Sequence, residues 1–140
     1  FFDQYIFKTA LRALGFGIIL TIMVQSSSIT TSTIVPLAGA GVLTLRQIFP
    51  FTLGANIGTT VTALLAAITG TVAALIAAIS HLLFNIFGII IIYGFPFLRS
   101  IPIRLAELIA EYSIKNKLIP IMYLLIVFVA LPLSIIIFGR

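Results

Sequence analysis

The sequence contains no cysteine among its 140 residues, and it carries few charged side chains. The absence of cysteine excludes disulfides, thiolate chemistry and any cysteine-based metal site. Charged residues make up 8% of the chain, against about 25% in soluble domains, so the chain cannot cover a water-facing surface. With 61% hydrophobic residues and a mean hydropathy of +1.32, it is predicted to be an integral membrane protein whose surroundings are a lipid bilayer.

The charged residues also limit what the chain can do. The three acidic residues, Asp3, Glu107 and Glu111, lie outside the predicted membrane spans, which argues against a carboxylate proton relay. The eight lysines and arginines are spread between apolar runs in the manner of interfacial anchors, so we expect no nucleic-acid partner. His81 is the only histidine and no Gly-x-Ser-x-Gly motif occurs, so the sequence does not support an enzyme such as an intramembrane serine hydrolase.

One stretch of the chain is polar where its surroundings are apolar. Eight of the nine residues from Gln25 to Thr33 are polar and uncharged. Unpaired polar groups are costly in the bilayer core, so this polar island needs another helix, trapped water or an ion as its partner. The apolar segments 11–24 and 34–45 beside it are short or interrupted by glycine and proline. The region 11–68 therefore reads as broken half-helices, which in a transporter point to the central binding site.

A second polar segment extends from Gly54 to Thr60 and is followed by Thr62. The spacing of Gly54 and Gly58 matches GxxxG, which by itself indicates only close helix packing. Because these glycines flank Asn56 and hydroxyls follow at once, we favour an unwound turn that exposes oxygen ligands. Hydroxyl and amide oxygens suit Na⁺, as oxygen ligands suit other hard cations, while hydroxyl hydrogens and free backbone N–H groups donate to phosphate.

The rest of the chain is divided by turns into longer segments. Residues 69–71 are a predicted turn, 72–98 a transmembrane helix, and 118–138 a final span with prolines near its start and inside it. Residues 101–117 are predicted to form an amphipathic helix in the membrane interface, with a favourable Glu111–Lys115 pair on its charged face. His81 and Asn85 share one helix face, which is more typical of a polar contact between helices than of a proton relay.

Three motifs resemble the type II sodium/phosphate cotransporter family in their order and spacing: Gln25-Ser-Ser-Ser28, Pro36-Leu-Ala-Gly-Ala-Gly-Val42 and Pro50-Phe-Thr-Leu-Gly-Ala-Asn-Ile-Gly-Thr-Thr60. The likeness is to the second of that family's two inverted repeats, and it covers nearly all of the chain. It implies an all-α membrane protein with a broken, re-entrant helical hairpin plus transmembrane helices, one half of an inverted-repeat transporter. Residues 1–140 are then a single transmembrane domain, the C-terminal repeat of a longer protein, and the absent first-repeat half is its partner.

The resemblance also implies a function and a set of ligands. The function is sodium-coupled symport of inorganic phosphate by alternating access, with no cofactor beyond the transported Na⁺ and phosphate and no transition metal. The residues that would hold Na⁺ are Gln25, Ser26, Ser28, Thr59 and Thr62. The residues that would hold phosphate are Ser26, Ser27, Ser28, Asn56 and Thr60. The tight link at residues 69–71 suggests a compact, bacterial-type member, located in the plasma (bacterial inner) membrane.

Two other functions fit the same composition. In a non-transporting membrane scaffold, the Ser/Thr and Gly faces would serve only helix association. In an ion channel subunit, flux would be far faster than turnover-limited transport and phosphate would not be concentrated.

Overall fold

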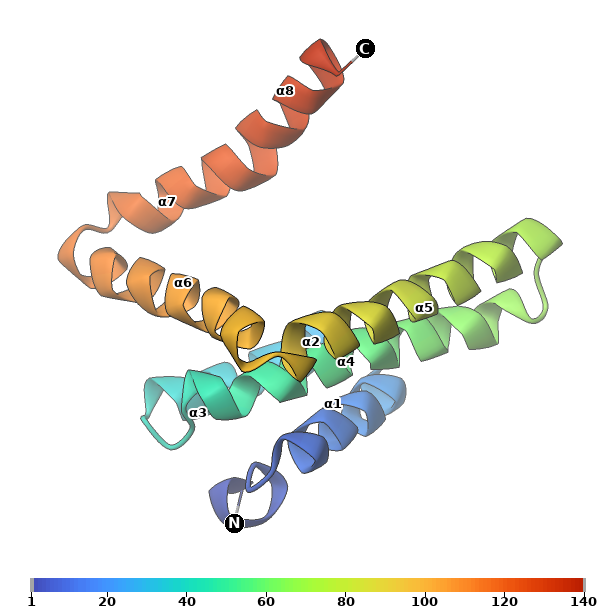
Figure 1. The fold of residues 1–140 in the computed structure, drawn as a ribbon, viewed down its shortest axis with the longest axis horizontal. Helices are drawn as coiled ribbons and strands as arrows, with labels where there is room; N and C mark the ends of the chain where they lie inside the picture. The colour runs from blue at the N-terminus through green and yellow to red at the C-terminus, as the bar shows by residue number, and fades with distance from the viewer. Residues whose placement is uncertain (1, 140) are drawn as a thin grey trace. The chain divides into compact units, whose positions relative to one another are not determined.

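Helices make up all of the secondary structure in the part of the chain that the computed structural model describes, residues 2–139, with side chains from residue 4 onward (Figure 1). The chain divides into two units between Arg99 and Ser100. The elements are η1 (Phe2–Ile6, a π-helix), α1 (Ala10–Val24), α2 (Ser27–Ser32), α3 (Val35–Gly39), α4 (Leu45–Ala67), α5 (Val72–Gly94), α6 (Pro96–Lys115), α7 (Leu118–Leu125), η2 (Ile126–Ala130, a π-helix) and α8 (Leu131–Phe138).

Three stretches are long and apolar enough to cross a membrane: Leu45–Ala67, Val72–Gly94 and Leu118–Phe138. The prediction of an all-α membrane protein is thus confirmed. Helix α1 has 15 residues, which at about 1.5 Å per residue cover roughly 22 Å, less than the ~30 Å hydrocarbon core. Helix α1 by itself is therefore too short to cross the membrane.

The polar island interrupts the helix, as the sequence predicts. Helix α1 ends at Gln25, whose backbone is left-handed with φ 56° and ψ 24°. Ser26 follows in an extended conformation and begins α2. The chain then returns along α2 and α3, and after a turn at Gly41 (φ 71°) it enters α4. Figure 1 shows α4 running in the same direction as α1, so α1 with α2 and α3 forms a helical hairpin beside α4.

The predicted unwound turn at residues 54–60 is wrong, because α4 is continuous from Leu45 to Ala67. Its glycines serve packing instead. A Cβ at Gly54 would overlap the backbone of Leu14, and one at Gly58 would lie 2.6 Å from the Cβ of Thr21, so only glycine permits this approach of α1. The GxxxG spacing of Gly54 and Gly58 therefore indicates close helix packing in this structure.

The start of α4 is defined by its capping residues. Thr44 caps the helix, and its side chain and that of Gln47 each bind the other residue's backbone N–H in a capping box. Arg46 and Gln47 therefore lie in the first turn. Pro50 is tolerated inside the helix near this end, at the cost of one backbone hydrogen bond.

The contact between α1 and α4 is the most extensive between elements of the chain. Its neighbouring residues advance together along both helices, which makes the pair parallel: Leu14 with Gly54, Gly17 with Ala55, and Thr21 with Gly58. Beneath it, the ring of Phe51 is fully buried, with its centroid 5.7 Å from that of Phe7 and 5.9 Å from that of Phe16. This small core fixes how α1 lies on α4.

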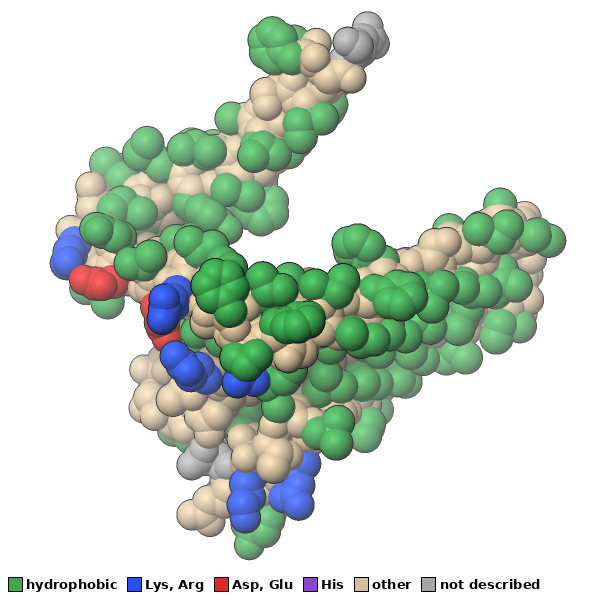
Figure 2. Space-filling model, in the orientation of Figure 1, with side chains coloured by type: hydrophobic (Ala, Val, Ile, Leu, Met, Phe, Trp, Pro, Cys, Tyr) green, Lys and Arg blue, Asp and Glu red, His purple; other side chains and the backbone are tan. Residues whose placement is uncertain are grey.

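Helix α5 ends at Gly94, before the predicted end at residue 98. Phe95 is extended, as residues before proline usually are, and Pro96 opens α6 at its first position. Helix α6 therefore begins earlier than the predicted 101 and contains Pro102 in its interior. Arg99 lies over the ring of Tyr93, 5.4 Å from its centroid. Hydrophobic side chains gather along the exposed surface of α5 (Figure 2). In its most apolar 18 residues, only 6% are buried.

In the second unit, the segment 118–138 is helical throughout. The π-helical turn η2 precedes Pro132, and the Leu131 N–H binds the Ile126 carbonyl. This wider turn accompanies the proline, which offers no N–H of its own. On α6 the predicted pair is present, with Lys115 Nζ 3.0 Å from Glu111 Oε1. Both groups are exposed, so the pair contributes only tenths of a kcal/mol.

Substitution of two glycines in α1 tests the close packing of α1 against α4. Gly17→Ala places a methyl group against the Phe51 carbonyl, whereas Gly15 has nothing within 4 Å of an added Cβ. We expect Gly17→Ala to lower the free energy of unfolding by about 1–3 kcal/mol. We expect Gly15→Ala to leave it unchanged or raise it by up to about 1 kcal/mol, because alanine favours helix. Thermal unfolding of the purified protein in detergent measures both, and equal effects would contradict the close contact.

Candidate functional site

The break between α1 and α2 offers two kinds of polar backbone. The last carbonyls of α1 have no partner within the helix, except that the Thr21 carbonyl accepts the Gln25 N–H at 2.7 Å. On the other side of the break, the Ser26 hydroxyl accepts the Ile29 N–H at 3.3 Å and caps α2. Ser27 and Ser28 form the first turn of α2. The predicted residues 25–28 thus form the break itself.

The Ser26 hydroxyl can still donate one hydrogen bond to a ligand. Because its oxygen accepts the Ile29 N–H, its hydrogen is free to donate. Within the described residues, the side chains of Gln25, Ser27 and Ser28 make no hydrogen bond. Gln25 and Ser28 are exposed and Ser27 is half-buried. All four side chains therefore have capacity for an external ligand.

The Thr59 and Thr62 hydroxyls of α4 have already donated their hydrogens, so they can only accept. Thr59 donates to the Ala55 carbonyl at 3.1 Å, and Thr62 donates to the Thr59 carbonyl at 2.8 Å. Once the hydrogen is engaged, the oxygen still has lone pairs to offer. These two half-buried side chains can therefore present oxygen to a cation but not a hydrogen to an anion.

The parallel register relates the break to these hydroxyls. Thr21 is level with Gly58, and the next helical turn brings α1 to Gln25 and α4 to Thr62. The end of α1 and the Thr59–Thr62 turn thus lie at the same level along the paired helices. Helix α2 contacts both α1 and α4, which places the start of the return limb beside the same region.

Two of the predicted phosphate ligands, Asn56 and Thr60, do not offer a free donor at the break. Asn56 is exposed and sits about 200° around the helix from Gly54, so it lies on the face of α4 away from α1. Thr60 is fully buried, and its hydroxyl donates to the Ile57 carbonyl at 2.7 Å. As the structure stands, neither offers a donor at the break.

Sequence reasoning missed two buried hydroxyls beside the break. Thr21 on α1 and Thr30 on α2 are fully buried, and neither hydroxyl has a partner in the described part of the chain. Thr21 lies outside both polar motifs, and its one sequence signal is a position four residues before Gln25. Thr30 lies inside the island but outside the serine motif.

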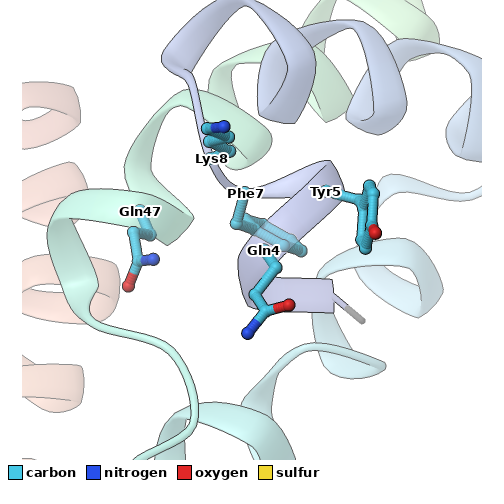
Figure 3. A pocket seen from close by; sticks show the side chains of 5 residues that line it. All are labelled: Gln4, Tyr5, Phe7, Lys8 and Gln47. Carbon is cyan, nitrogen blue, oxygen red and sulfur yellow. The ribbon is translucent and has the colours of Figure 1, made fainter.

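Two hollows in the described part of the chain are lined by none of the predicted ligands. A pocket of about 580 Å³ between η1 and the start of α4 is lined by Gln4, Tyr5, Phe7, Lys8 and Gln47 (Figure 3). A groove of about 530 Å³ between α4 and α5 is lined by alanines and by His81. Across residues 4–139, no group of three His, Cys, Asp or Glu side chains is placed to hold a metal ion. The described side chains at the break offer neutral oxygens.

The sequence of residues 4–98 matches the model of a family described as Na⁺/Pi-cotransporter. The chain belongs to this family. Its members are transporters rather than enzymes, and the chain is accordingly an integral membrane protein with apolar helices of spanning length. The match begins in η1 and ends in α6, so it covers the hairpin, α4 and α5.

Curated relatives from mammals agree with this membership. The chain is 44% identical over 131 residues to sodium-dependent phosphate transport protein 2B of Bos taurus, which is 91% of this chain and 19% of that protein. It is 42% identical to the 2B protein of Homo sapiens over the same shares, and 41% identical to the 2A protein of Oryctolagus cuniculus over 89% of this chain and 20% of that protein. The chain thus spans about a fifth of the length of these relatives. No solved structure matches it.

The left-handed backbone at Gln25 gives a prediction for this cotransporter-family chain. A non-glycine residue in this conformation is strained by about 1–2 kcal/mol. We therefore expect Gln25→Gly to unfold at a higher temperature than Gln25→Ala, by about 1 kcal/mol in free energy, because both lack the amide and only glycine relieves the strain. Thermal unfolding of the two variants in detergent checks this. Equal stability would show that the residue is not held left-handed.

Proposed function

We propose that this chain supplies half of the central site of a transporter that carries inorganic phosphate with Na⁺ across a membrane by alternating access. The proposal is supported by the family and by relatives named sodium-dependent phosphate transport proteins. The structural observation that carries it is the helix broken at Gln25, packed in register with the hydroxyl-bearing turn of α4. The remainder of the site would come from a first-repeat half, and no cofactor is needed besides the transported ions.

The cation side of the site is the end of α1. Its free carbonyls and the negative end of the helix dipole attract a cation. The amide oxygen of Gln25 and the oxygens of Thr59 and Thr62, whose hydrogens are engaged by carbonyls, add neutral ligands. Ser26 and Ser28 complete the proposed Na⁺ set from the far side of the break. Oxygen-rich sites without charge suit a monovalent hard cation.

The phosphate side of the site is the serine run. The Ser26 hydrogen is free, and Ser27 and Ser28 have no competing partner among the described residues, so all three can donate to phosphate oxygens. Asn56 would act on the face of α4 that looks away from α1, where the first-repeat half would contribute. Thr60 would act only after its hydroxyl turns from the Ile57 carbonyl.

In the transport cycle, bound Na⁺ lowers the cost of placing phosphate beside the same break. The loaded site then becomes accessible from the other side of the membrane. Inward movement of Na⁺ gains about 2.3 kcal/mol per charge for each 100 mV of membrane potential. We place the transporter in the plasma membrane, which for a bacterial-type member is the inner membrane.

A membrane scaffold remains the second candidate, because one observation favours it. The hydroxyls of Thr59 and Thr62 bind the backbone of their own helix, as threonines do that serve only packing. As Na⁺ ligands, they should raise the Na⁺ concentration for half-maximal phosphate uptake when replaced by valine. As packing residues, their replacement should change thermal stability and leave any ion dependence unaltered.

Uptake of radioactive phosphate into vesicles that contain the full-length protein tests the coupling. We expect uptake with a Na⁺ gradient and none above background when K⁺ replaces Na⁺. Gln25→Ala and Ser26→Ala should each raise the half-activating Na⁺ concentration by about tenfold, since one ligand to an ion contributes on the order of 1.5–3 kcal/mol. Ser134→Ala is the control, because Ser134 binds the Leu131 carbonyl in α8, far along the chain from the break. Equal uptake in K⁺ would reject the proposal.

A second measurement separates the roles of the two hydroxyl groups. Thr62→Ser keeps the oxygen and Thr62→Val removes it. We expect the serine variant to keep Na⁺ activation within about twofold and the valine variant to lose about tenfold in apparent Na⁺ affinity. Equal Na⁺ activation in both variants would contradict a cation role for this hydroxyl.

A further inference from the structure

Two threonine hydroxyls lie buried beside the break with no hydrogen-bond partner in the described part of the chain. The side chains of Thr21 and Thr30 are 0% exposed, and neither Oγ1 atom is paired. An unpaired hydroxyl in a buried place destabilises the fold, because it loses its hydrogen bonds to water and gains none in return. In a native fold, such a group usually has a partner, and where the described residues provide none, a water molecule or an ion can take that place.

Neighbouring threonines show that pairing within the helix is available here. Thr59, Thr60 and Thr62 each donate to a carbonyl one turn earlier, at 3.1, 2.7 and 2.8 Å. Thr21 and Thr30 also lie in helices, where a carbonyl stands one turn earlier, yet their hydroxyls bind none. Their oxygens are therefore directed elsewhere.

Both threonines are joined to the break through their backbones. The Gln25 N–H donates to the Thr21 carbonyl at 2.7 Å, and the Thr30 N–H donates to the Ser26 carbonyl at 3.0 Å. The Thr21 side chain also faces α4, since a Cβ on Gly58 would lie 2.6 Å from its Cβ. Helices α1, α2 and α4 contact one another in pairs, so the two hydroxyls flank the break where three helices meet.

We propose that the hydroxyls of Thr21 and Thr30 are two further oxygen ligands of the Na⁺ ion at this break. The inference rests on the proposed Na⁺-coupled transport and adds ligands outside its serine motif. Both hydroxyl oxygens are covered from solvent, so an ion that binds them must first lose its own water there. Neutral hard oxygens are suitable ligands for such an ion. Binding of Na⁺ then provides the partner that both groups lack.

The test replaces each hydroxyl by a methyl group of the same shape in the full-length transporter. We expect Thr21→Val and Thr30→Val each to raise the Na⁺ concentration for half-maximal phosphate uptake by about tenfold. The phosphate concentration for half-maximal uptake at saturating Na⁺ should change by less than about twofold, because the serine donors remain. The rise in unfolding temperature on adding NaCl in place of KCl should also shrink.

Thr52→Val is the matched control. Thr52 lies in α4, outside the proposed site, and its hydroxyl donates to the Phe49 carbonyl at 2.8 Å. We expect this variant to keep the wild-type Na⁺ dependence. A shift as large as that of Thr21→Val would show that any lost threonine hydroxyl has this effect, and it would overturn the proposal.

Further outcomes are equally decisive. Unchanged Na⁺ dependence in both valine variants, with equal gains in unfolding temperature in NaCl and KCl, would show two hydroxyls that are merely unpaired. Should a valine variant fail to fold, the Ser and Cys variants at the same position differ by one atom; Na⁺ activation should survive only in the serine variant, and equal activation overturns the proposal. Phosphate uptake by the wild type that does not depend on Na⁺ would instead reject the proposed function. If wild-type uptake depends on Na⁺ and the valine variants need no more Na⁺ for half-maximal uptake, only these two ligands are rejected.

Discussion

The first unit depends on the close approach of α1 to α4 across glycine. Gly17, Gly54 and Gly58 let the two backbones meet where any side chain would collide. In a bilayer, apolar side chains gain little by leaving lipid, so helices associate through such van der Waals contact and through hydrogen bonds. The contact sets the parallel register, and the register in turn decides which polar groups lie beside the end of α1.

In the proposed site, the ion that each hydroxyl can bind follows from where its hydrogen goes. On α4 the threonine hydrogens are engaged by their own helix, which leaves oxygen lone pairs for a cation. At the start of α2 the Ser26 oxygen is engaged by a backbone N–H, which leaves its hydrogen for an anion. One type of functional group thus serves opposite charges, and the local backbone decides which.

The sequence identified the break at Gln25 because a run of polar residues in an apolar chain has few structural explanations. It misjudged residues 54–60, since glycines and threonines look the same in an unwound turn as in a tightly packed helix. Only the partner helix distinguishes the two, and the contact of Gly58 with Thr21 is not visible in either segment alone. The early end of α5 could have been predicted from the local sequence, because a residue before proline favours an extended backbone. The apolar run that continues to residue 98 hid this signal at Phe95.

The parallel course of α1 and α4 has a consequence for sidedness. Both helices run from the same end of the pair to the other, so the hairpin of α1, α2 and α3 brings the chain back toward the end from which α1 starts. Helix α4, which is long and apolar enough to cross a membrane, then leads to the Thr69–Thr71 turn at its opposite end from Thr44. If α4 spans the bilayer, a reagent that cannot cross the membrane reaches these two turns from different compartments, although they are only 25 to 27 positions apart in the chain.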